Sequence, residues 1–348
     1  MGALPPNYEL AAFELWRKAG ILVQESISSD SRSVYATGVR HLRNFLVEMN
    51  PQLTYPFSDP DWVMFYVWLL ERVTPETASS YLSHVAFAFE TSAGIPRPDW
   101  KRFPLLTRAK KGAKRSRPRN RKRKHPVTWD LACRMIDHVQ IRPDNVTRLS
   151  GMLIFVVLLL TGISGWFRLG ELIPTDKKTH PEKIIRRGQI TVFREPGTVP
   201  YMRIWLFRSK GDPLNEGVPV YVPGNSEFPQ YCPVRWMEAL MRVTDSPTVN
   251  PATPLFTFPN GTLVLKAPFI KWLRSRLRRL GLDCSLYAGH SLRIGAAVSA
   301  ARRGLSDELI KRLGRWKSDA YLLYVKFTPL TIQKLRTLIS QMATIRNN

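Results

Sequence analysis

The first hundred residues repeat apolar side chains at helical spacing. Apolar positions recur at intervals of three and four over residues 8–23, 33–49, 62–73 and 77–91. These stretches are bounded by start signals at Ser31, Asp59 and Thr74 and by stop signals at Gly20, Asn50 and Gly94. The pattern predicts a helical domain over residues 1–107.

From residue 126 the pattern becomes mixed. Helical spacing over 128–139 and 147–160 is followed by apolar and polar alternation over 189–194, 201–209 and 218–222, which predicts a three-stranded antiparallel sheet. Helical spacing then returns over 266–280, 291–303, 307–313, 320–327 and from Pro329 onward. The predicted fold class is mainly α with a small antiparallel sheet, that is, α+β.

Composition supports two folded domains in one intracellular chain. The sequence has 348 residues, 44% of them hydrophobic, which suffices for two cores. No basic segment followed by an apolar one opens the chain, so we expect no secretory signal. The apolar run at 152–167 is interrupted by small and polar residues and falls short of the ~20 residues of a membrane helix. The three cysteines have no metal-ligand spacing, so we expect neither a disulfide framework nor a metal site.

Charge is distributed unevenly along the chain. Lys and Arg number 52 against 27 Asp and Glu, giving a net charge of +25. Residues 108–124 hold 11 of the basic residues and no acidic one, so we expect residues 108–125 to form an extended basic linker. A basic connector between two folded domains points to a polyanionic partner. A nuclear-import role is the alternative for this run and is compatible with polyanion binding.

Candidate catalytic residues lie at the boundaries of the predicted elements of the second domain. The sequence contains no Walker loop and no GxSxG nucleophile motif. Instead it carries GWFRLGEL at 165–172, GHSLRIGAA at 289–297 and LGRWKSDAYLLY at 313–324. His290 and Arg293 are three apart at a predicted helix start, so they share one face.

These three segments resemble the tyrosine recombinases, the phage-integrase-like family of site-specific DNA strand exchangers. The last segment is most similar to the recombinases of eukaryotic mobile elements, the DIRS-type retrotransposons and Cryptons. The resemblance implies a helical core-binding domain at 1–107, a catalytic domain at 126–328 and a C-terminal helix for subunit exchange at 329–348. The residues that match the family's catalytic positions are Arg168, Lys210, His290, Arg293, Trp316 and Tyr324, with Glu171 as a supporting acidic residue.

The chemistry of strand transfer explains these residue types. A phosphodiester under attack gains negative charge on its non-bridging oxygens, and planar guanidinium groups can bind them bidentately. Preorganised donors of this kind contribute about 3 to 4 kcal/mol each. Tyrosine is a weak nucleophile at its usual pKa of ~10, so Tyr324 needs nearby cations or a base such as His290. Lys210 would protonate the leaving 5′ oxygen. No metal or other cofactor is required.

Alternatives remain open for several of these positions. Arg168 and Glu171 are three residues apart, which also suits an ion pair on the surface of a helix. His290 could instead cap a helix or pack in the core. Arg208 and Lys183 compete with Lys210 for the general-acid role. Tyr321 competes with Tyr324 as nucleophile, although Tyr321 is better placed to pack.

The resemblance also implies the partners. Double-stranded DNA would be bound by a homotetramer on two duplexes, in the nucleus if the source is eukaryotic and in the cytoplasm otherwise, with no membrane and no small-molecule cofactor involved. The implied function is integration or excision of a mobile element through a 3′-phosphotyrosyl intermediate. The alternatives are an inactive, domesticated DNA-binding or assembly protein and a type IB topoisomerase-like enzyme. Candidate DNA-binding residues are Arg32, Arg40, Arg43, Lys110, Lys111, Lys114, Arg115, Arg117, Arg119, Arg121, Lys122, Arg123 and Lys124.

Overall fold

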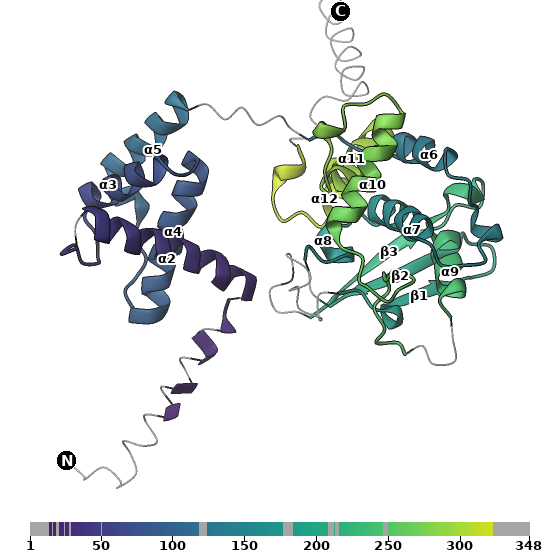
Figure 1. The fold of residues 1–348 in the computed structure, drawn as a ribbon, viewed down its shortest axis with the longest axis horizontal. Coiled ribbons are helices and arrows are strands. Elements are labelled where there is room, and N and C mark those ends of the chain that lie inside the picture. The colour runs from purple at the N-terminus through teal and green to yellow at the C-terminus, as the bar shows by residue number, and fades with distance from the viewer. Residues whose placement is uncertain are drawn as a thin grey trace, which may run out of the picture. The chain divides into compact units, whose positions relative to one another are not determined.

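The chain divides into two compact units, Met1–Arg121 and Lys122–Asn348, called here the first and the second unit (Figure 1). The computed structural model describes residues 14–15, 17–18, 21–23, 25–27, 29–49, 51–117, 124–176, 184–207, 212, 216–245 and 250–322. Among the helices of these residues, none combines the length and the apolar character needed to cross a membrane.

The first unit is helical around an aromatic core. The helices predicted over 33–49, 62–73 and 77–91 are present as α2 (Ser29–Met49), α3 (Asp59–Leu70) and α4 (Pro75–Ala93). The helix predicted over 8–23 lies largely outside the described residues. Helix α3 begins with a capping box in which Ser58 and Asp61 bond each other's backbone N–H, and α4 ends at Gly94, whose φ is 66°. Trp62, Phe65 and Tyr66 of α3 are buried against α2 and α4, so rings supply most of this core.

The expectation of an extended segment at 108–125 is wrong for its first half. Residues Pro104–Ser116 form helix α5, which follows a short 3₁₀ turn at Trp100–Arg102. The backbone N–H groups of Leu105 and Leu106 donate to the carboxylate of Asp59 in α3 at 2.8 and 2.9 Å, which caps the helix. Leu106 and Ala113 are buried on one face. Packing and capping by another helix therefore outweigh the mutual repulsion of the basic side chains.

The second unit combines helices with one small sheet. Its α-helices, drawn from teal to yellow in Figure 1, include α9, which the sequence analysis missed. The α-helices are α6 (Trp129–Asp137), α7 (Gly151–Ser164), α8 (Leu169–Leu172), α9 (Pro233–Val243), α10 (Lys266–Arg279), α11 (Ser291–Arg302) and α12 (Asp307–Leu313). Short 3₁₀ turns lie at Pro143–Asn145, Arg187–Gln189, Pro229–Tyr231, Cys284–Leu286 and Asp319–Tyr321.

The predicted antiparallel sheet is confirmed. Strands β1 (Ile190–Phe193), β2 (Tyr201–Leu206) and β3 (Val218–Pro223) pair in the order β1-β2-β3. Alternate residues of the central strand β2, at Met202, Ile204 and Leu206, are buried in the core. The strand therefore alternates between a core face and a more exposed face, as its sequence predicts.

Helix α7 is the centre of the second unit, and α11 packs closely against it. Positions 156–163 of α7 are all buried, as expected for a core helix that is apolar on every side. The approach of α11 depends on small residues. A Cβ on Gly162 of α7 would lie 3.0 Å from Leu292 of α11, so this glycine lets the end of α7 lie beside the start of α11. A Cβ on Gly295 of α11 would overlap the carbonyl oxygen of Val127, just before α6.

Candidate active site

Arg168 and Glu171 lie at the short helix α8, directly after the turn that ends α7. The Arg168 N–H donates to Glu171 Oε2 at 2.9 Å, and its guanidinium Nη1 donates to Glu171 Oε1 at 2.7 Å. Trp166 in the preceding turn has a φ of 55°, which costs a non-glycine residue on the order of 1–3 kcal/mol. The Glu171 carboxylate therefore fixes both the backbone and the side chain of Arg168.

A second arginine, Arg315, binds the same carboxylate from the turn after α12. Its Nη2 donates to Glu171 Oε2 at 2.9 Å, and its Nη1 donates to the Gly165 carbonyl at 3.1 Å. The Glu171 side chain is only 6% exposed. Its buried negative charge is thus shared between two guanidinium groups.

Arg293 is completely buried behind this pair. It is 0% exposed and donates to the carbonyls of Trp166, at 3.1 Å, and of Gly314. The ring of Trp316 lies 4.6 Å from its guanidinium carbon, within cation–π range. Burial and then the charge of Arg168 lower the pKa of Arg293 to about 9, although Glu171 opposes the shift. We call Arg168, Glu171, Arg293 and Arg315 the arginine cluster.

His290 precedes α11 as its N-cap residue, next to the arginine cluster. Gly289 allows the approach, because a Cβ there would lie 2.8 Å from the side chain of Leu169 in α8. Removal of surrounding water, followed by the charges of Arg293 and Arg168, lowers the pKa of His290. The imidazole is therefore mainly neutral at pH 7, the form in which one ring nitrogen can accept a proton.

Trp316 and Tyr321 pack together at the edge of this site. Their ring centroids are 5.8 Å apart, and Trp316 also meets Trp166 edge to face at 6.1 Å. Tyr321 is 4% exposed and belongs to the core of the second unit. Burial, followed by the charges of Asp307 and Asp319, raises the pKa of Tyr321. A buried phenol with a raised pKa is poorly suited to act as a nucleophile.

Several of the candidate residues lie outside the described residues. These are Lys210 with its alternatives Arg208 and Lys183, the candidate nucleophile Tyr324, the linker residues Arg119, Arg121, Lys122 and Arg123, and the C-terminal segment 329–348. The structure therefore brings together Arg168, Glu171, His290, Arg293 and Trp316 of the predicted catalytic set.

The candidate DNA-binding residues fall into two groups. The first group is exposed to solvent, on α2 and on α5: Arg32, Arg40, Arg43, Lys111, Lys114 and Arg115. The second group is engaged within the protein. Lys110 lies 4.7 Å from the centroid of Trp100, Arg117 donates to the Leu70 carbonyl, and Lys124 donates to the Ser285 carbonyl at 2.8 Å. Arg117 and Lys124 are exposed as well, but their side chains are bonded to backbone carbonyls, so the first group is the better candidate for contact with a polyanion.

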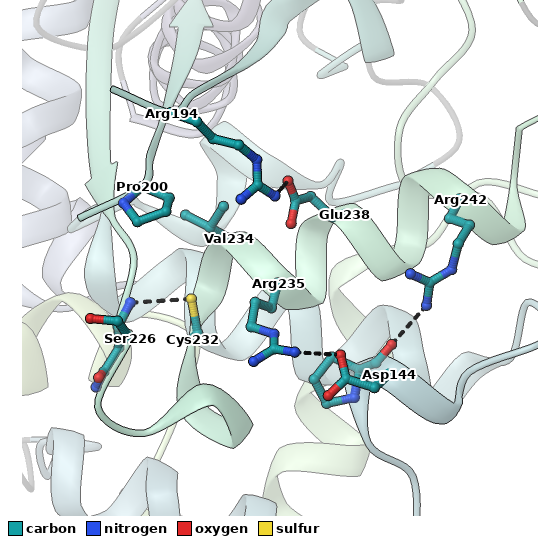
Figure 2. A pocket seen from close by; sticks show the side chains of 11 residues that line it. Asp144, Arg194, Pro200, Ser226, Cys232, Val234, Arg235, Glu238 and Arg242 are labelled. Carbon is teal, nitrogen blue, oxygen red and sulfur yellow. Dashed lines mark hydrogen bonds and ion pairs between the residues drawn. The ribbon is translucent and has the colours of Figure 1, made fainter. Parts of the chain in front are cut away.

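A separate cavity of about 390 Å³ in the second unit is also lined by arginines (Figure 2). Each of these arginines already has a partner. Arg194 pairs with Glu238, Arg235 pairs with Asp144 at 2.7 Å, and Arg242 donates to the Pro143 carbonyl. This cavity therefore offers an anion less unbalanced positive charge than the arginine cluster does. In the described part of the chain, no three Asp, Glu, His or Cys residues are grouped to hold a metal ion.

Arg315 is the site residue that sequence reasoning missed. It lies inside the segment LGRWKSDAYLLY, next to Trp316, and the family resemblance assigns it no role. The signal was an arginine between a helix-ending glycine and a tryptophan. Its partner Glu171 is 144 residues earlier in the sequence, so the pairing appears only in the folded chain.

Comparison with known proteins gives one sequence relative and several related folds. No family model matches the chain. An integrase/recombinase xerD homolog of Selenomonas ruminantium is 30% identical over 166 residues, which are 47% of this chain and 43% of that protein. The chain thus matches less than half the length of this curated relative.

Three solved structures have the same fold at low sequence identity. The Tn1549 transposon integrase in complex with transposon right end DNA is 13% identical, with a TM-score of 0.54 over 91% of this chain and 95% of that one. A lambda integrase dimer bound to a COC′ core site is 12% identical, with a TM-score of 0.53 over 89% of this chain and 93% of that one. The XerH site-specific recombinase bound to palindromic difH is 11% identical, with a TM-score of 0.55 over 88% of this chain and 79% of that one. This chain is thus similar in sequence to an integrase/recombinase over part of its length, and it shares its fold with these three integrase and recombinase structures.

Proposed function

We propose that this chain is a site-specific DNA recombinase that cleaves and rejoins strands through a 3′-phosphotyrosyl intermediate. The observation that carries the proposal is the arginine cluster. Two guanidinium groups bind a single carboxylate, a third is fully buried behind them, and the histidine beside them is mainly neutral at pH 7. The site therefore carries more positive than negative charge, and a phosphodiester would balance it.

Exposure determines which arginine the phosphate meets first. The Arg168 side chain is 29% exposed, whereas Arg293 is fully buried. Arg168 therefore presents its guanidinium to the substrate, and Arg293 adds positive potential from behind. In a site from which water is excluded, this potential acts on the transition state with little screening.

The proposed reaction conserves the phosphodiester bond energy. The Tyr324 oxygen forms a bond to phosphorus as the bond from phosphorus to the 5′ oxygen breaks. The phenol proton passes to neutral His290, and Lys210 donates a proton to the departing 5′ oxygen. A 5′ hydroxyl of the partner strand then attacks the phosphotyrosine in the reverse sequence, so neither ATP nor a metal is consumed.

The finer parts of the proposal concern the setting of this reaction. The three similar integrase and recombinase structures are DNA complexes, which supports duplex DNA as the partner. We further propose a homotetramer on two duplexes, assembled through the segment 329–348, and integration or excision of a mobile element as the biological outcome. The DIRS-like and Crypton-like affinity of LGRWKSDAYLLY favours a eukaryotic element and a nuclear location.

A covalent-capture assay tests the function. Full-length protein is incubated with nicked suicide duplexes drawn from the DNA that flanks the gene, and protein–DNA adducts are resolved on denaturing gels. We expect an adduct with the wild type, none with Tyr324→Phe, and unchanged affinity for the duplex. An adduct that survives in Tyr324→Phe and disappears in Tyr321→Phe would move the nucleophile to Tyr321. No adduct with any flanking duplex would favour the inactive DNA-binding alternative.

A second assay separates recombination from relaxation. Supercoiled plasmids carrying one or two copies of the flanking DNA are treated with the protein and analysed for topoisomers and for deletion products. We expect deletion only from the two-copy plasmid. Relaxation of both plasmids without deletion would identify a type IB topoisomerase-like activity instead.

A further inference from the structure

The Glu171 carboxylate joins two arginines, Arg168 and Arg315, that lie far apart in the sequence of the second unit. Arg168 binds it through its backbone N–H and its Nη1, and Arg315 binds it through Nη2 at 2.9 Å. Because Glu171 is almost fully buried, water does not compete for these bonds. The orientation of Arg168 therefore depends on where Glu171 is held.

Arg315 holds that carboxylate in place through contacts on more than one side. Its guanidinium donates to the Gly165 and Trp166 carbonyls, at 3.1 and 3.4 Å, as well as to Glu171. Its φ of 53° is unfavourable for a side-chain-bearing residue, and the backbone keeps it while the guanidinium makes three contacts. A planar fork of donors can bind several acceptors at once, which a lysine ammonium on a flexible stem does less well.

The same contacts join the two turns on which the site is built. Arg315 belongs to the turn after α12 and bonds the turn after α7, while Arg293 bonds both turns through the carbonyls of Trp166 and Gly314. The Arg315 side chain is 16% exposed against 29% for Arg168, and its described contacts are with the protein itself. It therefore acts behind Arg168 and does not face the substrate directly.

We propose that Arg315 is a positioning residue that orients Arg168 for phosphate contact by holding the Glu171 carboxylate. This inference rests on the proposed strand-transfer function for its kinetic consequence, but its structural content is independent of that function. It assigns a role to a side chain that the family resemblance left without one.

The kinetic test uses full-length variants with a nicked suicide duplex from the flanking DNA. We expect Arg315→Gln to slow adduct formation 10- to 100-fold while the dissociation constant for DNA changes less than threefold. Glu171→Gln should give a similar loss, and the double variant should be no slower than the more severe single one, because both act through one bond. Arg315→Lys, which keeps the charge near Glu171 but not the full set of contacts, should recover part of the rate.

The control removes a more exposed arginine–carboxylate ion pair of similar length elsewhere in the second unit. Arg235→Gln breaks the 2.7 Å contact with Asp144 shown in Figure 2 and should leave the adduct rate unchanged. Equal rates for Arg315→Gln and wild type would overturn the proposal, as would independent, multiplicative losses in the double variant.

Crystal structures of the wild type and of Arg315→Gln complete the test without relying on activity. We expect the 2.7 Å contact between Arg168 Nη1 and Glu171 Oε1 to be lost or displaced in the variant. An intact contact would overturn the positioning role even if the variant were slow. If the wild type forms no adduct, the proposed function fails, and this comparison still decides the role of Arg315.

Discussion

The fully buried side chains of the first unit are aromatic and aliphatic, whereas the second unit also buries charged and hydroxyl groups. Every buried polar or charged residue among those described lies in the second unit: Thr161, Glu171, Ser291, Arg293 and Ser299. The first unit instead packs Trp62, Phe65 and their neighbouring rings. The two cores therefore differ in composition: the first is apolar and rich in aromatic rings, and the second encloses charged and hydroxyl groups within an apolar core.

The largest effect we predict comes from overfilling the second core. In Gly295→Ala the new methyl group would collide with the Val127 carbonyl, which is backbone and cannot rotate away. We expect a loss of about 4 kcal/mol or failure to fold, seen in thermal unfolding of the purified protein.

Gly112→Ala is the matched control for this change. It adds the same methyl group to α5 of the first unit, where nothing lies within 4 Å. It should raise stability by about 0.5–1 kcal/mol, since alanine is the better helix former. Similar effects of the two substitutions would show that the close approach of α11 is not a constraint.

The second prediction compares two carboxylates that each pair with arginine. Glu171→Gln leaves the partly buried guanidinium groups of Arg168 and Arg315 uncompensated and should cost about 3 kcal/mol. Glu48→Gln in the first unit disturbs a pair with Arg72 whose side chains are 35% and 46% exposed, and should cost less than about 1 kcal/mol. Urea unfolding of both variants measures the difference, and equal costs would contradict the contrast between the cores.

The third prediction is that low pH destabilises the first unit. Burial lowers the pKa of both His41 and His84 in the first unit, with Arg40 and Arg72 adding to the shift of His41. Their Nδ1 atoms are buried without a hydrogen-bond partner. Because the folded-state pKa lies below the usual 6.5, the unfolded state binds protons first. Stability is thus full above pH 6.5 and falls as the pH drops below it.

Chemical denaturation followed by tryptophan fluorescence at pH 7.5, 6.5 and 5.5 checks this expectation. The slope should not exceed about 1.4 kcal/mol per pH unit for each histidine. His84→Gln should flatten the pH dependence. A transition of the first unit that stays constant over this range would refute the assignment.

The smallest effect we predict is on the salt dependence of DNA binding. Lys111, Lys114 and Arg115 are exposed on α5, and replacing all three by glutamine preserves the helix while removing three charges. If each contacts a phosphate, the slope of log K against log salt should become shallower by about 2.7. Fluorescence anisotropy with a labelled duplex at several salt concentrations measures it, and an unchanged slope would leave the import role for this basic segment.

Local patterns predicted much of this fold, and contacts between distant residues account for what they missed. The sheet and α10 to α12 follow from alternation and helical spacing, which are properties of short segments. Helix α5 was missed because its cap, Asp59, lies 46 residues before Leu105. Helix α9 was missed although Pro233 marks its start and its apolar residues recur at helical spacing, so the local pattern was sufficient to predict it. Within the site, motif residues were identified by resemblance, whereas the role of Arg315 required the tertiary pairing.

The buried charge of Arg293 also links the stability of the second unit to anion binding. A guanidinium that is out of water and next to Arg168 raises the free energy of the folded state, and an arriving anion relieves that repulsion. Any anion that binds the folded protein but not the unfolded chain stabilises it by RT ln(1 + [L]/Kd). The second unit should therefore melt at a higher temperature in sulfate than in chloride at equal ionic strength, and higher still with duplex DNA. The energetic cost of burying Arg293 next to Arg168 would then be recovered in part whenever an anion binds.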